Sequence, residues 1–173
     1  TVLNTASTVW TSNHRLRGVA YLMVKLTYET DVFPNGIPNI SAVIEGKKIL
    51  NVSTSATAYS NNPANIIYNY LTSSDGLGAS TSEIDLATFQ QARADCDDSI
   101  SITGGTQSRY TCNGVIILNR KPVEVIEDLI SSCAGTLTYQ QGKFKLKVGK
   151  ASSSVRTLTD NDLAGDLKIV TRP

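Results

Sequence analysis

The chain has 173 residues, enough for one compact domain or two small ones. Sixteen basic and fifteen acidic residues give a net charge of +1, which is unlike the basic surface of proteins that bind nucleic acid or anionic membranes. No apolar run approaches the roughly 20 residues of a membrane-spanning helix. The composition therefore predicts neither membrane insertion nor sequence-specific nucleic-acid binding. Because the chain starts at Thr1 without an initiator Met, we interpret it as a piece of a longer protein.

The first 58 residues are predicted to be mostly strand. Between Gly18 and Thr30 apolar residues alternate with others, which predicts a long strand with one buried side. The residues of that side are Ala20, Leu22, Val24, Leu26 and Tyr28. The stretch "ISAVIEGKKILNV" predicts a hairpin that turns at Glu45-Gly46-Lys47. We therefore expect residues 1–58 to form a β-rich segment, part of a barrel-like domain.

Capping signals predict three helices after residue 58. Asn62 is a good N-cap, and Pro63 suits the first helical position because its missing N–H costs nothing there. Asp85 is a strong N-cap for a second helix. A third helix should start at Pro122 and stop at Gly135, in the C′ place where glycine is common. The predicted helices cover residues 63–73, 86–97 and 122–134.

Strands are predicted between and after these helices. "SISIT" should lead through Gly104-Gly105 into a strand "RYTCNGVIIL", with a turn or bulge at Asn113-Gly114. "GTLTYQQGKFKLKV" predicts a hairpin in which Leu137 and Tyr139 face Phe144 and its neighbours across a "QQGK" turn. We therefore predict an α+β domain over residues 59–173, in which three helices pack on an antiparallel or mixed sheet.

The glycine-rich stretch "DGLGAS" after the first predicted helix is a candidate phosphate loop. Gly76 and Gly78 fit a dinucleotide fingerprint, but Thr81 stands where the third glycine belongs. The stretch also follows a helix, whereas phosphate loops of this kind follow a strand. We therefore interpret it as the exit from a helix.

Two acidic stretches are candidate cation sites. A calcium loop that starts at Asp160 in "DNDLAGD" would place Thr171 at its twelfth, bidentate position, where a glutamate belongs. The run Asp95–Asp98 lies at a predicted helix C-terminus and could bind a cation, but we interpret it as a solvated helix end. Asp97 could instead cap the next turn. We expect no bound metal at either stretch.

Cysteine, histidine and carboxylate positions predict no catalytic centre. The cysteines are Cys96, Cys112 and Cys133, whose number and spacing fit neither a disulfide framework nor a zinc finger, so we expect buried, reduced thiols. His14 is the single histidine and lies far from any nucleophile motif. Glu124 and Glu127 are predicted on an exposed helix face. Alternating lysines near residue 145 predict a solvated strand face rather than a phosphate-binding one. We predict no enzyme activity, no cofactor and no metal.

Six stretches follow one another in a characteristic order: "RGVAYLMVKLTYETDVFPNGIPNISAVIEGKKI", "SNNPANIIYNYLT", "GLGA", "EIDLATFQQARADCD", "RYTCNGVI" and "AGTLTYQQGKFKLKVG". Together they resemble the central hub region of the phage tail tip attachment protein family (protein J-like and related to baseplate hubs) of lambda-like phages. The resemblance runs from about Arg17 to Thr171. The positions that match its pattern are Asn62, Pro63, Gly78, Asp85, Gly114 and Gly135, which have folding reasons and no catalytic role.

The resemblance implies a structural protein of the virion tail tip. Proteins of this family form a trimer that closes the tail tube, hold the tape-measure protein, support host attachment and open for DNA delivery. It also implies contact with the tail tube or distal tail protein, and assembly in the cytoplasm of the bacterial host. The alternatives are a tail-associated peptidoglycan hydrolase and a small receptor-binding or sugar-binding module.

Tyr21 and Met23 are the candidate interface residues. They lie on the second face of the first predicted strand, where a solvent-facing strand rarely keeps an apolar pair. We expect the early strands to belong to a barrel that missing sequence or a neighbouring protomer completes. In the alternative, the N-terminal stretch "TVLNTASTVW" covers the pair within one chain.

Overall fold

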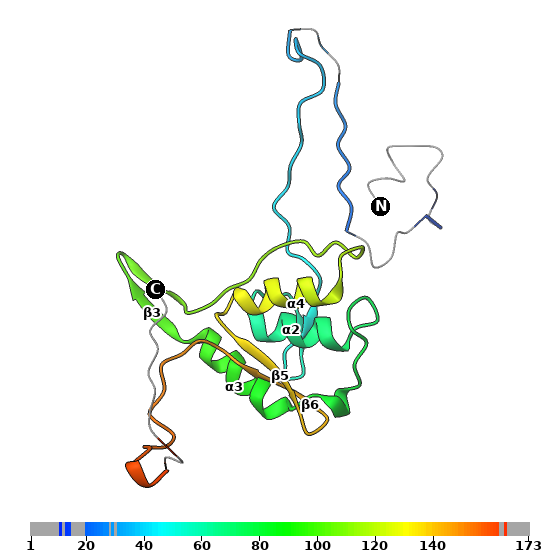
Figure 1. Ribbon diagram of the computed structural model, residues 1–173. Helices are drawn as coiled ribbons and strands as arrows, with labels where there is room; N and C mark the ends of the chain where they lie inside the picture. Colours follow the sequence, from blue (N-terminus) through cyan, green and yellow to red (C-terminus); the bar gives the residue numbers. More distant parts are fainter. Residues whose placement is uncertain are drawn as a thin grey trace. The chain divides into compact units, whose positions relative to one another are not determined.

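The computed structural model describes residues 11, 13–14, 20–27, 29, 31–162 and 165. The chain divides into two units, Thr1–Ile44 and Glu45–Pro173. In the first unit, residues 20–27 and 38–44 run as extended traces joined by a turn, in which Phe33 N–H donates to Glu29 O at 2.9 Å (Figure 1). The domain boundary predicted after residue 58 stays a prediction.

The second unit contains the regular elements of the described chain (Figure 1). In chain order they are strands β1 (Ile49–Leu50) and β2 (Thr57–Ala58), helix α2 (Pro63–Thr72), 3₁₀ turn η1 (Thr81–Glu83), helix α3 (Leu86–Asp97), strands β3 (Ser99–Ile102) and β4 (Gly105–Ser108), helix α4 (Pro122–Ser131), strands β5 (Thr136–Gln140) and β6 (Lys143–Lys147), and 3₁₀ turn η2 (Asp160–Asp162). The strands form three two-stranded antiparallel sheets. The α+β class is confirmed, with three helices and with strands first.

The core of the second unit lies between the three helices and the β5–β6 hairpin. Helix α2 packs against α3 and α4, and α3 packs against β6. Ile67 and Leu71 of α2 and Phe89 of α3 are at most 1% exposed, and burying each contributes about 1.5–3 kcal/mol. The ring of Tyr68 meets that of Phe89 edge to face at 5.9 Å. Helix α2 therefore turns its apolar residues toward this core.

The β5–β6 hairpin has the predicted register. Leu137 pairs with Leu146, and Tyr139 pairs with Phe144. The ring centres of Tyr139 and Phe144 lie 4.7 Å apart. Both central turn residues, Gln141 and Gly142, have positive φ angles of 53° and 74°, as a type I′ turn requires. Turn chemistry and alternation therefore fix this hairpin locally.

The end of α4 differs from the prediction in one respect. The helix stops at Ser131, and the left-handed residue after it is Ala134, with φ of 47°. A Cβ at Gly135 would lie 2.9 Å from Cys133 Sγ and 3.0 Å from Lys147 O. The glycine is therefore required by close packing against β6 and not by a left-handed backbone.

The long strand predicted at residues 18–30 is wrong where the structure describes it. Residues 20–27 and 29 carry no strand assignment. The side predicted as buried is open to solvent, since Leu22, Val24 and Leu26 are 63%, 44% and 41% exposed. Alternation predicts that one face of a strand would be apolar. Burying that face requires a second surface to pack on it, and the described residues of the first unit do not supply one.

The hairpin predicted around Glu45-Gly46-Lys47 is also wrong. Residues 40–48 have no strand, and β1 pairs forward with β2 instead. The cause is Asn51, whose Oδ1 accepts hydrogen bonds from the N–H groups of Ser53 at 2.9 Å and Thr54 at 3.2 Å. This local turn, closed by Asn51 N–H donating to Ala56 O, folds the chain back immediately after β1.

The strand predicted over "RYTCNGVIIL" is absent, since no residue from 109 to 118 has a strand assignment. Its first N–H groups have other partners. Arg109 N–H donates to Asp98 O, Tyr110 N–H to Cys96 O, and Cys112 N–H to Asn61 O. The stretch is therefore tied to the end of α3 and the start of α2 as irregular chain, with no turn at Asn113-Gly114.

Candidate functional site

The "DGLGAS" stretch wraps the C-terminus of α2. Four successive N–H groups donate to carbonyls at that helix end: Gly76 and Gly78 to Ser73 O, Leu77 to Tyr70 O, and Ala79 to Leu71 O, at 2.8–3.1 Å. A Cβ at Gly76 would lie 1.9 Å from Tyr70 O. Because these donors are engaged within the chain, the loop cannot offer them to a phosphate. The prediction of a helix exit is confirmed.

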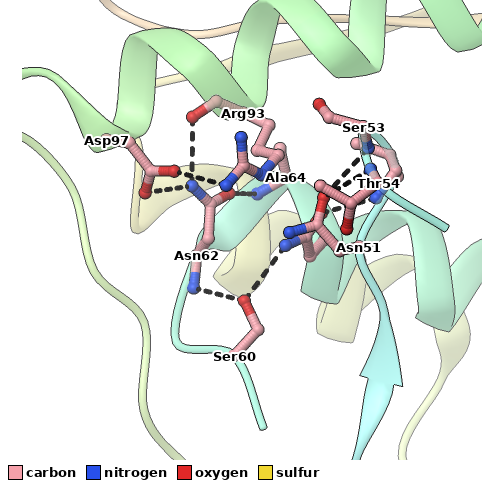
Figure 2. A network of polar contacts seen from close by, with 10 residues as sticks. Asn51, Ser53, Thr54, Ser60, Asn62, Ala64, Arg93 and Asp97 are labelled. Carbon is pink, nitrogen blue, oxygen red and sulfur yellow. Dashed lines mark hydrogen bonds and ion pairs between the residues drawn. The ribbon is translucent and has the colours of Figure 1, made fainter. Parts of the chain in front are cut away.

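A polar network centred on Asn62 joins the start of α2 to the end of α3 (Figure 2). The Asn62 Oδ1 accepts from Ala64 N–H at 3.0 Å, which makes the predicted N-cap. Its Nδ2 donates to Arg93 O at 3.0 Å and to Asp97 Oδ1 at 2.8 Å. Asp97 also forms an ion pair with Arg93 at 3.0 Å. Asn62 is only 5% exposed, so the cap is also a buried bridge between two helices.

The same network continues to the β1–β2 loop through Asn65, which is 1% exposed. Its Oδ1 accepts from Val52 N–H at 3.1 Å, and its Nδ2 donates to Ser60 Oγ at 3.0 Å. Gln90 of α3 donates to Val52 O at 2.9 Å. Sequence reasoning gave Asn65 no role, because its partners lie outside its own helix. A cavity of about 270 Å³ is lined in part by the polar residues of this network, Ser60, Asn62, Asn65, Arg93 and Asp97. These residues bond to one another and so hold structure together.

The acidic run Asp95–Asp98 lies at the C-terminal end of α3 and is partly solvated, as predicted, but its carboxylates are also paired with basic side chains, which the prediction did not include. Lys150 Nζ lies 2.7 Å from both Asp95 Oδ1 and Asp98 Oδ2. The hydrogen bond from Lys150, followed by Arg109 at 3.3 Å, lowers the pKa of Asp98, and the Asp95 hydrogen bond raises the pKa of Lys150. The charges that oppose the helix dipole are thus matched by side-chain cations. Asp97 bonds to Asn62 and caps no following turn.

The three cysteines are free thiols. Cys96 and Cys133 are fully buried, as predicted, whereas Cys112 is only half-buried. Burial raises the pKa of the Cys96 thiol to about 12, with Cys133 as the next cause, and burial likewise raises the pKa of Cys133. Both thiols are therefore protonated at neutral pH, and buried thiols of this kind are poor nucleophiles.

The remaining candidate residues are dispersed over the described chain. Glu124 pairs with Arg120 at 3.9 Å and Glu127 is exposed, so they form no catalytic pair. His14 bonds locally to Thr11. In the calcium candidate, Asp162 accepts hydrogen bonds from Thr159 and Arg156, and position 171 lies outside the described residues. Among the residues that the structure describes, no group of three or more His, Cys, Asp or Glu side chains could hold a metal.

Tyr21 and Met23, the candidate interface pair, lie on the extended trace of the first unit. Tyr21 is 48% exposed and Met23 is half-buried. The stretch "TVLNTASTVW", the alternative cover for this pair, lies outside the described residues. Their interface role stays a prediction.

None of the helices in the described part of the chain is long and apolar enough to cross a membrane.

Comparison with known proteins gives one relevant similarity. No protein-family model matches the chain. The chain is 27% identical, over 171 residues, to the tip attachment protein J of Escherichia phage SECphi27. The match covers 86% of this chain and 14% of the relative, so the chain spans about one seventh of that protein's length. The similarity therefore points at most to the phage tail tip proteins.

Proposed function

We propose that the chain is a structural part of a phage or prophage tail tip, in the hub region that closes the tail tube. The observation that carries this proposal is the similarity to a tip attachment protein J along 86% of the chain. The order of the motifs, from the first strand-like stretch to the β5–β6 hairpin, supports the same placement.

The geometry supports a scaffold and not an enzyme. Each residue group that carries chemistry in other proteins has a structural partner here: the glycine loop caps α2, the acidic run pairs with Lys150 and Arg109, and two thiols are buried. In contrast, residues 20–44 expose several large apolar side chains, which is typical of a protein–protein interface. Binding to other proteins is therefore the function that the described surface suits best.

Within this proposal the chain works in the virion tail tip after assembly in the host cytoplasm. It forms a homotrimer in the full-length protein, with Tyr21 and Met23 at an interface. Its other partners are the tail tube or distal tail protein and the tape-measure protein. The hub supports host attachment and opens for DNA delivery.

Loss of the gene tests the proposal directly. Phage produced without the gene should yield heads and incomplete tails, and plasmid-borne protein should restore infectivity. Mass spectrometry of purified wild-type virions should find peptides of this chain in tail fractions. Infectious particles of normal tail morphology in the absence of the gene would contradict the proposed function.

A zymogram of the purified chain separates the scaffold from a tail-associated peptidoglycan hydrolase. We expect no clearing zone on host peptidoglycan and no stoichiometric zinc by elemental analysis. A clearing zone would favour the hydrolase.

A further inference from the structure

An open apolar segment, residues 113–118, lies between β4 and α4 in the second unit (Figure 1). Val115, Ile117 and Leu118 are 90%, 58% and 71% exposed. Within the described part of the chain, none of the backbone N–H groups from 113 to 118 donates to a backbone carbonyl. This segment thus shares two properties with an unpaired sheet edge: N–H groups without a backbone partner among the described residues, and exposed apolar side chains.

Both ends of the 113–118 segment are anchored. At its start, Cys112 N–H donates to Asn61 O at 2.8 Å, and Tyr59 donates its hydroxyl hydrogen to Asn113 Oδ1 at 2.8 Å. At its end, Arg120 N–H donates to Ile117 O, and the Arg120 guanidinium pairs with Asp128 of α4 at 2.7 Å. The segment is therefore held at both ends, while the N–H groups of its middle have no backbone partner among the residues that the structure describes.

The segment borders a cavity of about 330 Å³. Its lining includes Ile66 of α2, Val125 and Leu129 of α4, and residues 113–116 of the segment. Side chains of an added strand could therefore insert between the segment and the helices, where burial stabilises the contact.

The first unit offers a strand that fits this edge. Residues 20–27 are extended, contain no proline, and expose Leu22, Val24 and Leu26 on one side. In the described chain, their N–H groups form no backbone hydrogen bond either.

Charge favours one orientation. Asp31 follows residues 20–27, and Lys121 follows the 113–118 segment; neither is in an ion pair among the described residues. If the two stretches run parallel, their C-terminal ends meet and these opposite charges approach each other.

We propose that residues 20–27 of one copy add as a parallel strand to the 113–118 segment of a second copy. The two surfaces are different, so the contact is head-to-tail and can close a ring. Only the interpretation of such a ring as part of a tail tip rests on the proposed function. The contact itself can be tested on the 173-residue chain.

Analytical ultracentrifugation of two variants and their mixture tests the contact. The strand variant carries Leu22→Lys and Val24→Lys, and the segment variant carries Val115→Lys and Ile117→Lys. These side chains are exposed, so both variants should keep the wild-type circular dichroism. The wild-type chain should self-associate at high micromolar concentration, and each variant should associate at least about tenfold more weakly.

Mixing is the discriminating measurement. The strand variant keeps an intact segment and the segment variant keeps an intact strand, so their mixture should form a heterodimer that neither forms alone. Val155→Lys, at a side chain that is 98% exposed, is the matched control and should associate like wild type.

Three results would overturn the inference. A wild-type chain that stays monomeric at high micromolar concentration would overturn it. This includes the case in which residues 20–27 cover the 113–118 segment of their own chain, which would be seen as protection of the segment's amides from hydrogen exchange. Unchanged association of both variants would show that another surface is used. If mixing the two variants does not restore association, the contact is not head-to-tail. None of these results bears on infectivity without the gene, which tests the proposed function separately.

Discussion

Residues 20–44 and the helical core of residues 63–148 are both rich in apolar side chains, but they differ in what covers those side chains. In the helical core, Ile67, Leu71 and Phe89 are at most 1% exposed. In residues 20–44, Ile37 and Val43 are almost fully exposed, at 79% and 106%. The comparison separates a part of the chain that forms its own core from a part whose apolar surface suits another protein surface.

The largest effect on stability is expected from truncating a side chain of the buried core. Phe89→Ala should lower the free energy of unfolding by about 3–5 kcal/mol, because it leaves a cavity at the centre of the core. Leu22→Ala is the matched control at an exposed site and should change it by about 0.5 kcal/mol or less in dilute protein. Urea denaturation measures both. A large loss in the Leu22 variant of the monomer would show that residues 20–27 pack within their own chain.

A smaller effect is expected at the polar bridge. Asn62→Ala should lower the free energy of unfolding by about 1–2 kcal/mol, since it removes the cap of α2 and leaves Arg93 O and the Ala64 N–H without their partner. Asn119→Ala, at an exposed site, should have almost no effect. Equal denaturation midpoints for the two variants would contradict the role of Asn62.

The smallest effect is expected from removing the ion pairs of Lys150 with the variant Lys150→Met. The measurement is the urea denaturation midpoint of the wild type and of the variant as a function of pH. The pKa of Asp98 is lowered below its ordinary 3.8, so its pairing stabilises the fold fully above pH 3.8 and is lost as pH falls through the lower, folded-state pKa. The pKa of Lys150 is raised above 10.5, so the pairing persists through neutral pH. The gap between the two urea midpoints should therefore be constant near neutral pH, narrow below pH 3.8 as Asp98 is protonated, and narrow again well above pH 10.5 as Lys150 loses its charge. Lys47→Met, which removes an exposed pair with Asp75, should show a smaller gap.

Local signals in the sequence predicted the helices and one hairpin. Asn62, Asp85 and the Gln141-Gly142 turn act within a few residues of their own position, so capping and turn rules find them. The partners of the acidic run could not be found in this way, because Lys150 lies far along the chain from Asp95. The alternation at residues 18–30 placed apolar residues on one face of the predicted strand, but it contained no information about which part of the protein would cover that face.

The amide of Asn62 has a kinetic consequence. Because one side chain bonds both the first turn of α2 and the last turn of α3, neither helix end can fray without releasing the other. The two ends should therefore open as one cooperative unit, with similar rates of amide hydrogen exchange despite their separation in sequence. A force applied to the chain near residue 62 would then be shared between the two helices from the start.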